Sequence, residues 1–156
     1  MIKVNIVAIG KIKEKYFRDG IEEYSKRLKK YCSFNIVELP EENYSKAGAG
    51  EISNILAKEG ENILSHLKGH VICMAIEGKL CSSENLAQKL KGFIDKGTEV
   101  TFVIGGSYGI YKGVKDKANE LMSLSPSTFP HAMFRMILTE QIYRAFCIIQ
   151  GTPYHK

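Results

Sequence analysis

The feature that most constrains this chain is the regular alternation of apolar strand segments with amphipathic helical segments. Residues 71–76 and 100–104 are apolar at almost every position, which is typical of strands that are covered on both faces. A strand recurs after roughly 30 residues, the length of one strand–helix–strand unit. The pattern therefore predicts an α/β fold with a mainly parallel sheet and helices on both of its faces.

The expected elements follow from hydrophobic periodicity and from turn residues. Strands are expected over residues 2–9, 34–39, 71–76 and 100–104. Helices are expected over residues 14–31 and 51–67, between Ser82 or Ser83 and Gly97, and from Pro130 to Ile149. Gly69 is expected to cap the second helix, residues 77–79 to turn the chain, and residues 41–50 to form a loop. Since no linker or repeat interrupts the series, residues 1–156 are expected to form one domain.

The composition is that of a globular protein, with 44% apolar and 25% charged residues. No apolar run approaches the ~18 residues of a membrane span, and the chain enters a strand at once, without an apolar leader. We therefore expect a cytoplasmic protein with no membrane partner. The four cysteines are scattered without a C-x-x-C pair, so we expect neither a metal site nor a disulfide framework. Cys73 is expected to be a buried free thiol.

The net charge of +5 is distributed unevenly. Residues 1–31 hold nine Lys/Arg against four acids, a surplus of +5, whereas residues 32–99 hold seven against ten, a deficit of −3. Residues 100–125 and 126–156 contribute +1 and +2. A basic amino-terminal segment favours a polyanionic partner. A helix whose lysines only face water explains the same charge equally well.

Three glycines follow the last buried strand, in the sequence Gly105-Gly106-Ser107-Tyr108-Gly109. Glycine lets the backbone turn sharply and lets a ligand approach it closely. The loop matches neither the dinucleotide fingerprint nor the P-loop, and a tight turn without any ligand explains its glycines as well. Its place after a central strand favours a ligand site.

A second loop, residues 124–129, follows a short apolar segment and precedes the last helix. We expect the two loops to leave the carboxyl ends of neighbouring strands, which is where open α/β sheets bind ligands.

The last helix is apolar on almost every side. Arg135 and Thr139 lie on one side, and Glu140 and Arg144 lie roughly opposite. One side can pack on the sheet of the same chain, and a second copy of the chain is the simplest cover for the other, which predicts a homodimer. Glu140 and Arg144 are either a helix ion pair or, since an arginine among apolar residues is costly, part of a ligand site.

The carboxyl-terminal residues Tyr154, His155 and Lys156 combine a ring, an imidazole and an ammonium group. Such a combination suits stacking on a base and contact with phosphate, although chain ends are often simply solvated. His131, beside the second loop, is a further candidate, whereas His66 and His70 are expected to be structural.

Four segments taken together resemble the large-subunit ribosomal RNA methyltransferase H family, which belongs to the SPOUT class of α/β-knot methyltransferases. They are residues 104–109, residues 124–131, residues 140–145 and residues 154–156. The resemblance covers essentially the whole chain. It implies a homodimer with a carboxyl-terminal trefoil knot, which transfers a methyl group from S-adenosylmethionine (SAM) to N3 of a pseudouridine in 23S rRNA of the large ribosomal subunit.

The resemblance also implies functional residues. The SAM pocket would be formed by Met74, Gly105, Leu124, Ser125, Pro126, Ser127, Thr128 and Phe129. The catalytic candidates are His155, Tyr154, Glu140 and Arg144. Lys11, Lys13, Lys15 and Arg18 would bind rRNA phosphates. Of these SAM residues, Pro126 lacks an N–H group and can offer a cofactor only its carbonyl and its ring.

Two other functions fit parts of the sequence. A reductase or kinase of the α/β class is disfavoured because the nucleotide fingerprints are missing. A non-enzymatic RNA-binding protein of the ribosome would also have basic ends and a Tyr-His-Lys tail, and the glycine loop is the feature that argues against it.

Overall fold

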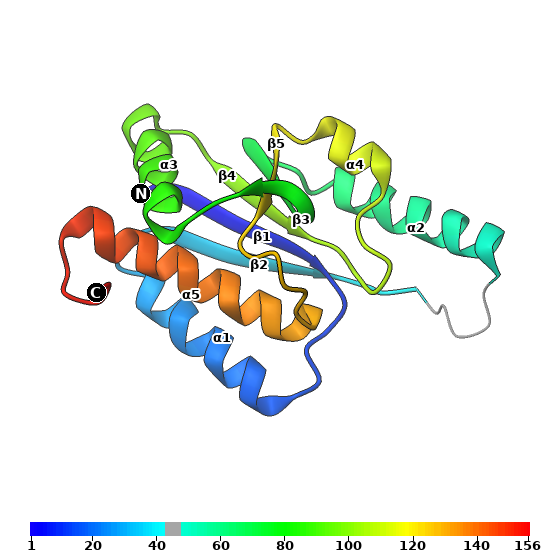
Figure 1. Ribbon diagram of the computed structural model, residues 1–156, viewed down its shortest axis with the longest axis horizontal. Coiled ribbons are helices and arrows are strands. Elements are labelled where there is room, and N and C mark those ends of the chain that lie inside the picture. The colour runs from blue at the N-terminus through cyan, green and yellow to red at the C-terminus, as the bar shows by residue number, and fades with distance from the viewer. Residues whose placement is uncertain (43–47) are drawn as a thin grey trace.

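Branched and aromatic side chains build five strands, and all of them pair in parallel. The computed structural model describes residues 1–42 and 48–156 (Figure 1). The strands are β1 Lys3–Ile9, β2 Ser33–Leu39, β3 His70–Leu80, β4 Val100–Ile104 and β5 Glu120–Ser123. Their order in the sheet is β2-β1-β4-β3-β5. Every residue of the central strand β4 is buried, as its apolar sequence predicts.

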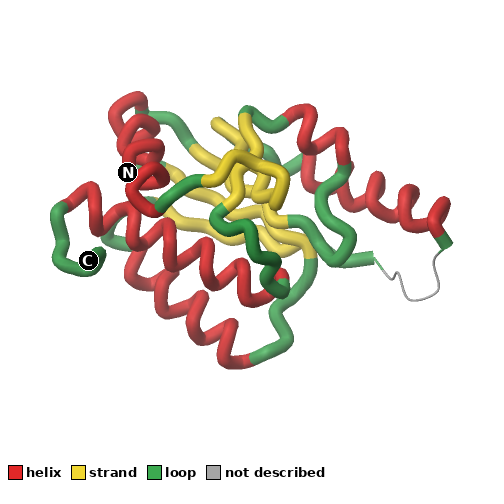
Figure 2. Tube along the Cα trace, in the orientation of Figure 1, coloured by secondary structure: helices red, strands yellow, loops and turns green. Residues whose placement is uncertain are grey.

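Helices cover both faces of this sheet (Figure 2). They are α1 Lys15–Leu28, α2 Ala49–Leu64, α3 Ser83–Lys96, α4 Lys112–Lys117 and α5 His131–Gln150. Apolar residues of α1, α3 and α5 form the core on one face, and those of α2 and α4 form a smaller core on the other. The predicted α/β fold with a parallel sheet between two helical layers is confirmed. Of the loop predicted over residues 41–50, residues 43–47 lie outside the described part of the chain.

Most predicted helix ends are close to the observed ones. The Ser82 hydroxyl accepts a hydrogen bond from the Asn85 N–H and caps α3, and Gly97 ends α3 with a φ of 65°. Two helices end earlier than predicted, at Leu28 and Leu64. The expected Gly69 cap is wrong, because α2 ends at Leu64 and its C-cap is Ser65. Burial of Cys73 is confirmed, and burial raises the pKa of this thiol to about 11.

Strand β3 departs from the prediction that residues 77–79 simply turn the chain. It continues to Leu80, but Met74 and Lys79 both pair with Met122 of β5, so the residues between them bulge out of the ladder. A Cβ atom on Gly78 would lie 2.5 Å from the Met122 nitrogen, so only glycine fits against β5 there. Figure 1 shows the end of β3 curving across β5. The trefoil knot in this region stays a prediction.

The strand order corrects one expectation about the two loops. They leave β4 and β5, which were expected to be neighbours, but β3 lies between these strands. A short apolar segment such as residues 121–124 gives no indication of which strand it will pair with. The two loops nevertheless lie at the same edge of the sheet, because all five strands run in the same direction.

Helix α5 lies between α1 and α3 on the sheet, as Figure 1 shows. Gly20 of α1 lets Met136 of α5 approach closely, since a Cβ atom on this glycine would lie 2.4 Å from the Met136 sulfur. Several apolar sides of α5 are therefore covered by the chain itself. The apolar character of α5, used above to predict a second copy, does not by itself require one. In the described part of the chain, no helix is long and apolar enough to cross a membrane.

Arg135 ties α5 to the carboxyl edge of the sheet. Its guanidinium, with only 3% of the side chain exposed, donates to the Glu38 carboxylate at 2.5 Å and to the Gly10 carbonyl oxygen at 2.9 Å. Glu38 is 42% exposed. The arginine is therefore a structural residue that connects α5 with the chain leaving β1 and β2.

The unequal burial of this pair predicts an unequal response to mutation. Glu38→Ala leaves a buried guanidinium without its carboxylate and should destabilise the fold by about 3 kcal/mol. Arg135→Met removes the buried charge and leaves Glu38 in contact with water, so it should cost only about 1 kcal/mol. Urea unfolding measures both free energies, and a larger loss for Arg135→Met would contradict this assignment.

Candidate active site

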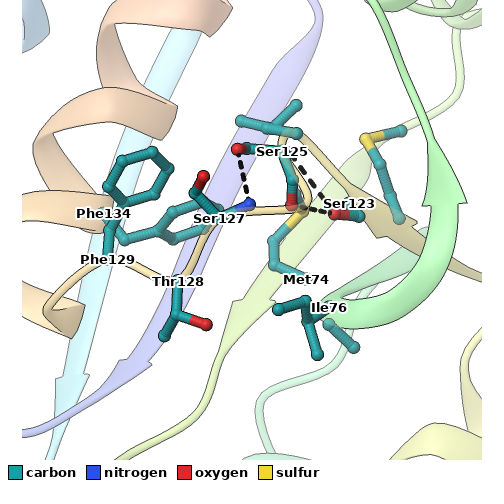
Figure 3. Close-up of a pocket in the computed structure, with 11 residues that line it drawn as sticks. Met74, Ile76, Ser123, Ser125, Ser127, Thr128, Phe129 and Phe134 are labelled. Carbon is teal, nitrogen blue, oxygen red and sulfur yellow. Dashed lines mark hydrogen bonds between the residues drawn. The ribbon is translucent and has the colours of Figure 1, made fainter.

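The loop between β5 and α5 forms one wall of a cavity of about 180 Å³ at the carboxyl edge of the sheet (Figure 3). Met74 of β3 and Phe134 of α5 close the other sides. The complete lining is Met74, Ala75, Ile76, Met122, Ser123, Leu124, Ser125, Ser127, Thr128, Phe129 and Phe134. Its walls are mainly apolar, with hydroxyl groups from the loop, which suits a largely apolar small ligand with a few polar atoms.

Short polar side chains fix the path of this loop. The Ser123 hydroxyl donates to the Ser125 carbonyl oxygen at 2.8 Å, and the Ser125 hydroxyl accepts from the Ser127 N–H at 2.9 Å. These local bonds hold the loop in a turn that is neither helix nor sheet. Within the described residues, no backbone-to-backbone hydrogen bond uses a group of residues 124–129. Serine hydroxyls bond the N–H and carbonyl groups of Ser125 and the N–H group of Ser127, so it is the other main-chain groups of the loop that can bind a ligand.

A second hollow, of about 230 Å³, lies beside the first and shares Met74 and Phe129 with it. The glycine loop forms its floor through Gly105, Gly106 and Gly109. A Cβ atom on Gly105 would lie 2.5 Å from the Gly109 carbonyl oxygen, so the loop can close only with glycine at this position.

Polar groups stand at the rim of this second hollow. Lys115 of α4 forms an ion pair with Glu77 at 2.5 Å, and this pair lowers the pKa of the Glu77 carboxyl. His131, at the start of α5, also lines the hollow. The two hollows together offer apolar walls on one side and groups of both charge signs on the other.

The predicted cofactor residues come together almost completely. Met74, Leu124, Ser125, Ser127, Thr128 and Phe129 line the first cavity, and Gly105 lines the second. Pro126 lines neither of them. Sequence reasoning missed Phe134 and the bulge residues Ala75, Ile76 and Glu77. Phe134 lies one turn into α5, a spacing that could have indicated it, whereas nothing in the sequence indicates the bulge.

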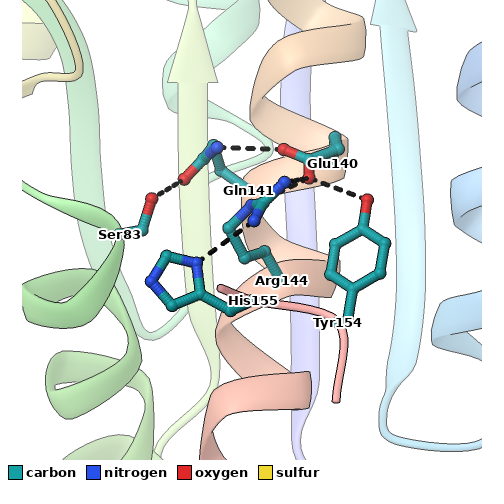
Figure 4. Close-up of polar contacts among 6 residues, drawn as sticks. All are labelled: Ser83, Glu140, Gln141, Arg144, Tyr154 and His155. Atoms are coloured by element: carbon teal, nitrogen blue, oxygen red, sulfur yellow. Dashed lines mark hydrogen bonds and ion pairs between the residues drawn. The ribbon is translucent and has the colours of Figure 1, made fainter. Parts of the chain in front are cut away.

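The four catalytic candidates form a single polar cluster on the outer side of α5 (Figure 4). One oxygen of Glu140 accepts from Arg144 Nε at 2.9 Å and from the Tyr154 hydroxyl at 2.9 Å. The other accepts from the Gln141 amide at 2.9 Å, and the Ser83 hydroxyl donates to the Gln141 amide oxygen. The tail thus lies across α5, held by Glu140 and by α3.

Hydrogen bonding assigns a tautomer to His155. Arg144 can only donate, so Nδ1 of His155, 3.1 Å from Arg144 Nη1, must accept. The ring proton then belongs on Nε2, which lies 2.9 Å from a Glu84 carboxylate oxygen. His155 lowers the pKa of that carboxyl through this hydrogen bond. As assigned from the network, the imidazole is neutral and held at both nitrogens.

Tyr154 is held in its neutral form. Burial raises the pKa of its hydroxyl, and hydrogen bonds with Tyr24 and Glu140 raise it further. The Arg144 guanidinium carbon lies 4.8 Å from the centre of the Tyr154 ring, in cation–π contact. A tyrosine with a raised pKa is a hydrogen-bond donor at neutral pH, and it is therefore a poor general base.

The polar cluster and the cavity are separate within one chain, since no residue of the cluster lines either hollow.

The four predicted RNA-binding residues do not all lie at one site. Lys11 and Lys13 line a groove on the other side of the glycine loop. Lys15 forms an ion pair with Asp19, and Arg18 donates to the Ile12 and Lys13 carbonyl oxygens.

Comparison with known proteins identifies the class. The chain matches the family model described as "Predicted SPOUT methyltransferase" over residues 2–155. The chain therefore belongs to the SPOUT methyltransferase family.

Two curated relatives are similar over their full length. Proteins named ribosomal RNA large subunit methyltransferase H from Streptococcus uberis and Streptococcus thermophilus are 46% and 48% identical to this chain. Each alignment covers 99% of this chain and 100% of the relative.

Solved structures share the fold at low sequence identity. A probable methylase family protein from Haemophilus influenzae has a TM-score of 0.62 at 15% identity, covering 100% of this chain and 72% of that one. A probable methyltransferase from Bordetella pertussis has a TM-score of 0.57 at 11% identity, covering 93% and 95%.

The raised pKa of Tyr154 predicts a specific alkaline response. The folded state holds this proton more tightly than the unfolded state, whose tyrosine pKa is about 10. The resulting stability is fully present below about pH 10 and is lost as the pH rises further. The unfolding free energy of wild type, minus that of Tyr154→Phe, should therefore fall above about pH 10. Urea titrations at several pH values measure this difference, and a constant difference would refute the assignment.

Proposed function

We propose that this protein transfers a methyl group from SAM to N3 of a pseudouridine in 23S rRNA of the large ribosomal subunit. The observation that carries the proposal is the paired cavity at the carboxyl edge of the sheet, walled by residues 124–129 and floored by the glycine loop. Membership in a methyltransferase family supports the reaction class. The names of the full-length relatives support rRNA of the large subunit as the substrate.

The residues present fit SAM. Met74, Leu124 and Phe129 offer apolar contact to its adenine and thioether parts, and the main chain of residues 124–129 offers hydrogen bonds to the adenine edge. Glu77 and Lys115 carry the charges opposite to those of its ammonium and carboxylate groups. When bound, SAM supplies a methyl group already activated by the sulfonium charge.

The chain itself must orient the base and receive the N3 proton. Glu140 already accepts three hydrogen bonds, and Tyr154 is held neutral. His155 is the best candidate for the base, because it is a neutral imidazole whose Nδ1 lone pair is occupied only by Arg144. Once freed from the histidine, Arg144 can stabilise the deprotonated base or bind its phosphate.

This assignment of roles requires a homodimer. Within one chain the polar cluster contributes nothing to the cavity lining, so the tail of a second copy would bring His155 and Tyr154 to the cofactor. The basic amino-terminal segment, with Lys11, Lys13, Lys15 and Arg18, would bind rRNA phosphates. The enzyme would work in the cytoplasm, where ribosomes are present.

Methyl transfer from labelled SAM to ribosomes lacking the modification tests the function directly. Wild type should label 23S rRNA, and Gly105→Ala should reduce SAM affinity about tenfold or more, since each 1.4 kcal/mol of lost binding is tenfold. The reason is the close contact between residues 105 and 109.

Gly92→Ala on α3 is the matched control, because a Cβ atom there meets nothing within 4 Å. Its SAM affinity, measured by calorimetry, and its methyl transfer should equal those of wild type. A wild-type protein that binds no SAM, or that labels no rRNA in any ribosomal particle, would overturn the proposed function.

The role of His155 makes a separate prediction. His155→Ala should lower kcat about 100-fold or more, the usual effect of losing a general base. Its KM for SAM should change little, since the proposed role of His155 is to take the N3 proton of the base and not to hold SAM. Steady-state kinetics with ribosomal particles separate the two constants, and a normal kcat would remove His155 from the chemistry.

A further inference from the structure

A wide groove of about 850 Å³ lies on the far side of the glycine loop from the cofactor cavity. Three segments form it: the chain leaving β1 with Lys11 and Lys13, the chain leaving β2 with residues 38–42, and the tip of the glycine loop at Ser107 and Tyr108. All three follow strand ends at one edge of the sheet. Figure 1 shows the loop after β4 reaching the chain that leaves β2.

The carboxylates of this groove are all engaged by protein groups. Glu38 forms an ion pair with Arg135 at 2.5 Å, and Glu42 forms one with Lys58 at 3.2 Å. Glu41 accepts from the Ser107 hydroxyl at 2.8 Å and from its N–H at 3.2 Å. Each of these carboxylates therefore connects its segment to another part of the chain.

The lysines of the groove are in a different situation. Lys11 and Lys13 are exposed, and neither forms an ion pair within residues 1–42 and 48–156. Arg135 and Lys58 balance the charges of Glu38 and Glu42, whereas Glu41 is bonded only by neutral groups of Ser107 and keeps its charge. The two ammonium groups therefore leave the groove with a surplus of one positive charge. Such a surface favours a polyanion.

Tyr108 adds a second kind of recognition. Its ring lies at the edge of the groove and is 51% exposed. The neighbouring Ser107 is anchored by Glu41, so the backbone that carries the ring is held in place. An exposed aromatic ring beside cationic side chains is the arrangement that binds single-stranded nucleic acid, by stacking on bases and contact with phosphates.

We propose that this groove holds a single-stranded segment of the rRNA substrate, with phosphates at Lys11 and Lys13 and a base stacked on Tyr108. The inference rests on the proposed function and specifies where the RNA lies. The same five-residue loop, Gly105 to Gly109, forms the floor of the cofactor hollow and an edge of this groove. RNA in the groove would therefore be separated from the cofactor by this loop alone. Lys15 and Arg18, which bond to their own chain, contribute less than Lys11 and Lys13.

Tyr108→Ala and Tyr108→Phe test the stacking, in methyl transfer to unmodified ribosomal particles. Tyr108→Ala should raise KM for the particle about tenfold, within the range found for removing one stacked base. Tyr108→Phe keeps the ring and should behave as wild type. The SAM affinity of both variants should stay unchanged, since Tyr108 does not line the cofactor hollows.

Lys11→Ala and Lys13→Ala test the phosphate contacts. Each should flatten the dependence of log affinity for the particle on log salt by about 0.7, the value for one phosphate on a single strand. Lys96→Ala, at the carboxyl end of α3 and outside the groove, should leave the slope unchanged.

The outcomes separate the two levels of the proposal. A wild type that methylates rRNA, with Tyr108→Ala at normal KM and both lysine variants at normal salt slope, would overturn the groove assignment alone. A wild type that neither binds SAM nor labels rRNA would overturn the proposed function, and the groove assignment with it.

Discussion

The common direction of all five strands is the constraint on which the rest of this structure depends. Parallel pairing brings every strand's carboxyl end to one edge, and the chain leaves that edge in five loops. Residues 10–13, 38–42, 105–109 and 124–129 therefore become neighbours although they are distant in sequence. The Glu41–Ser107 and Arg135–Gly10 hydrogen bonds then fix these loops relative to one another and to α5.

Helix α5 separates two kinds of chemistry. Its first turn, with His131 and Phe134, faces the cofactor hollows. Two turns later, Glu140 and Arg144 hold the tail on the outer surface between α1 and α3. A single helix thus carries residues of both the hollows and the polar cluster, and no residue of the cluster lines either hollow. This arrangement is what supports the proposed completion of the active site by a second copy.

The sequence alone predicts the layers, because these depend on local patterns such as continuous apolar strands and amphipathic helices. The individual SAM residues are implied by the family resemblance, and most of them line the two hollows, but their role stays a prediction. The sequence does not predict that β3 lies between β4 and β5, since pairing is a non-local choice. The β3 bulge around Gly78 is not predicted either, because it also depends on how β3 pairs with β5. Likewise, Arg135 and Arg144 look alike in the sequence, and only burial shows that one anchors the fold while the other holds the tail.

The position of the tail limits what the chain can carry at its ends. His155 contacts both Arg144 and Glu84. An added segment at the carboxyl terminus would start inside the polar cluster and compete for its hydrogen bonds. Met1 is 83% exposed and belongs to neither the cluster nor the cofactor hollows. Met1 shares a hollow with Thr152, which precedes Tyr154 by two residues, so a domain or affinity tag fused at the amino terminus needs a linker that leads away from the tail.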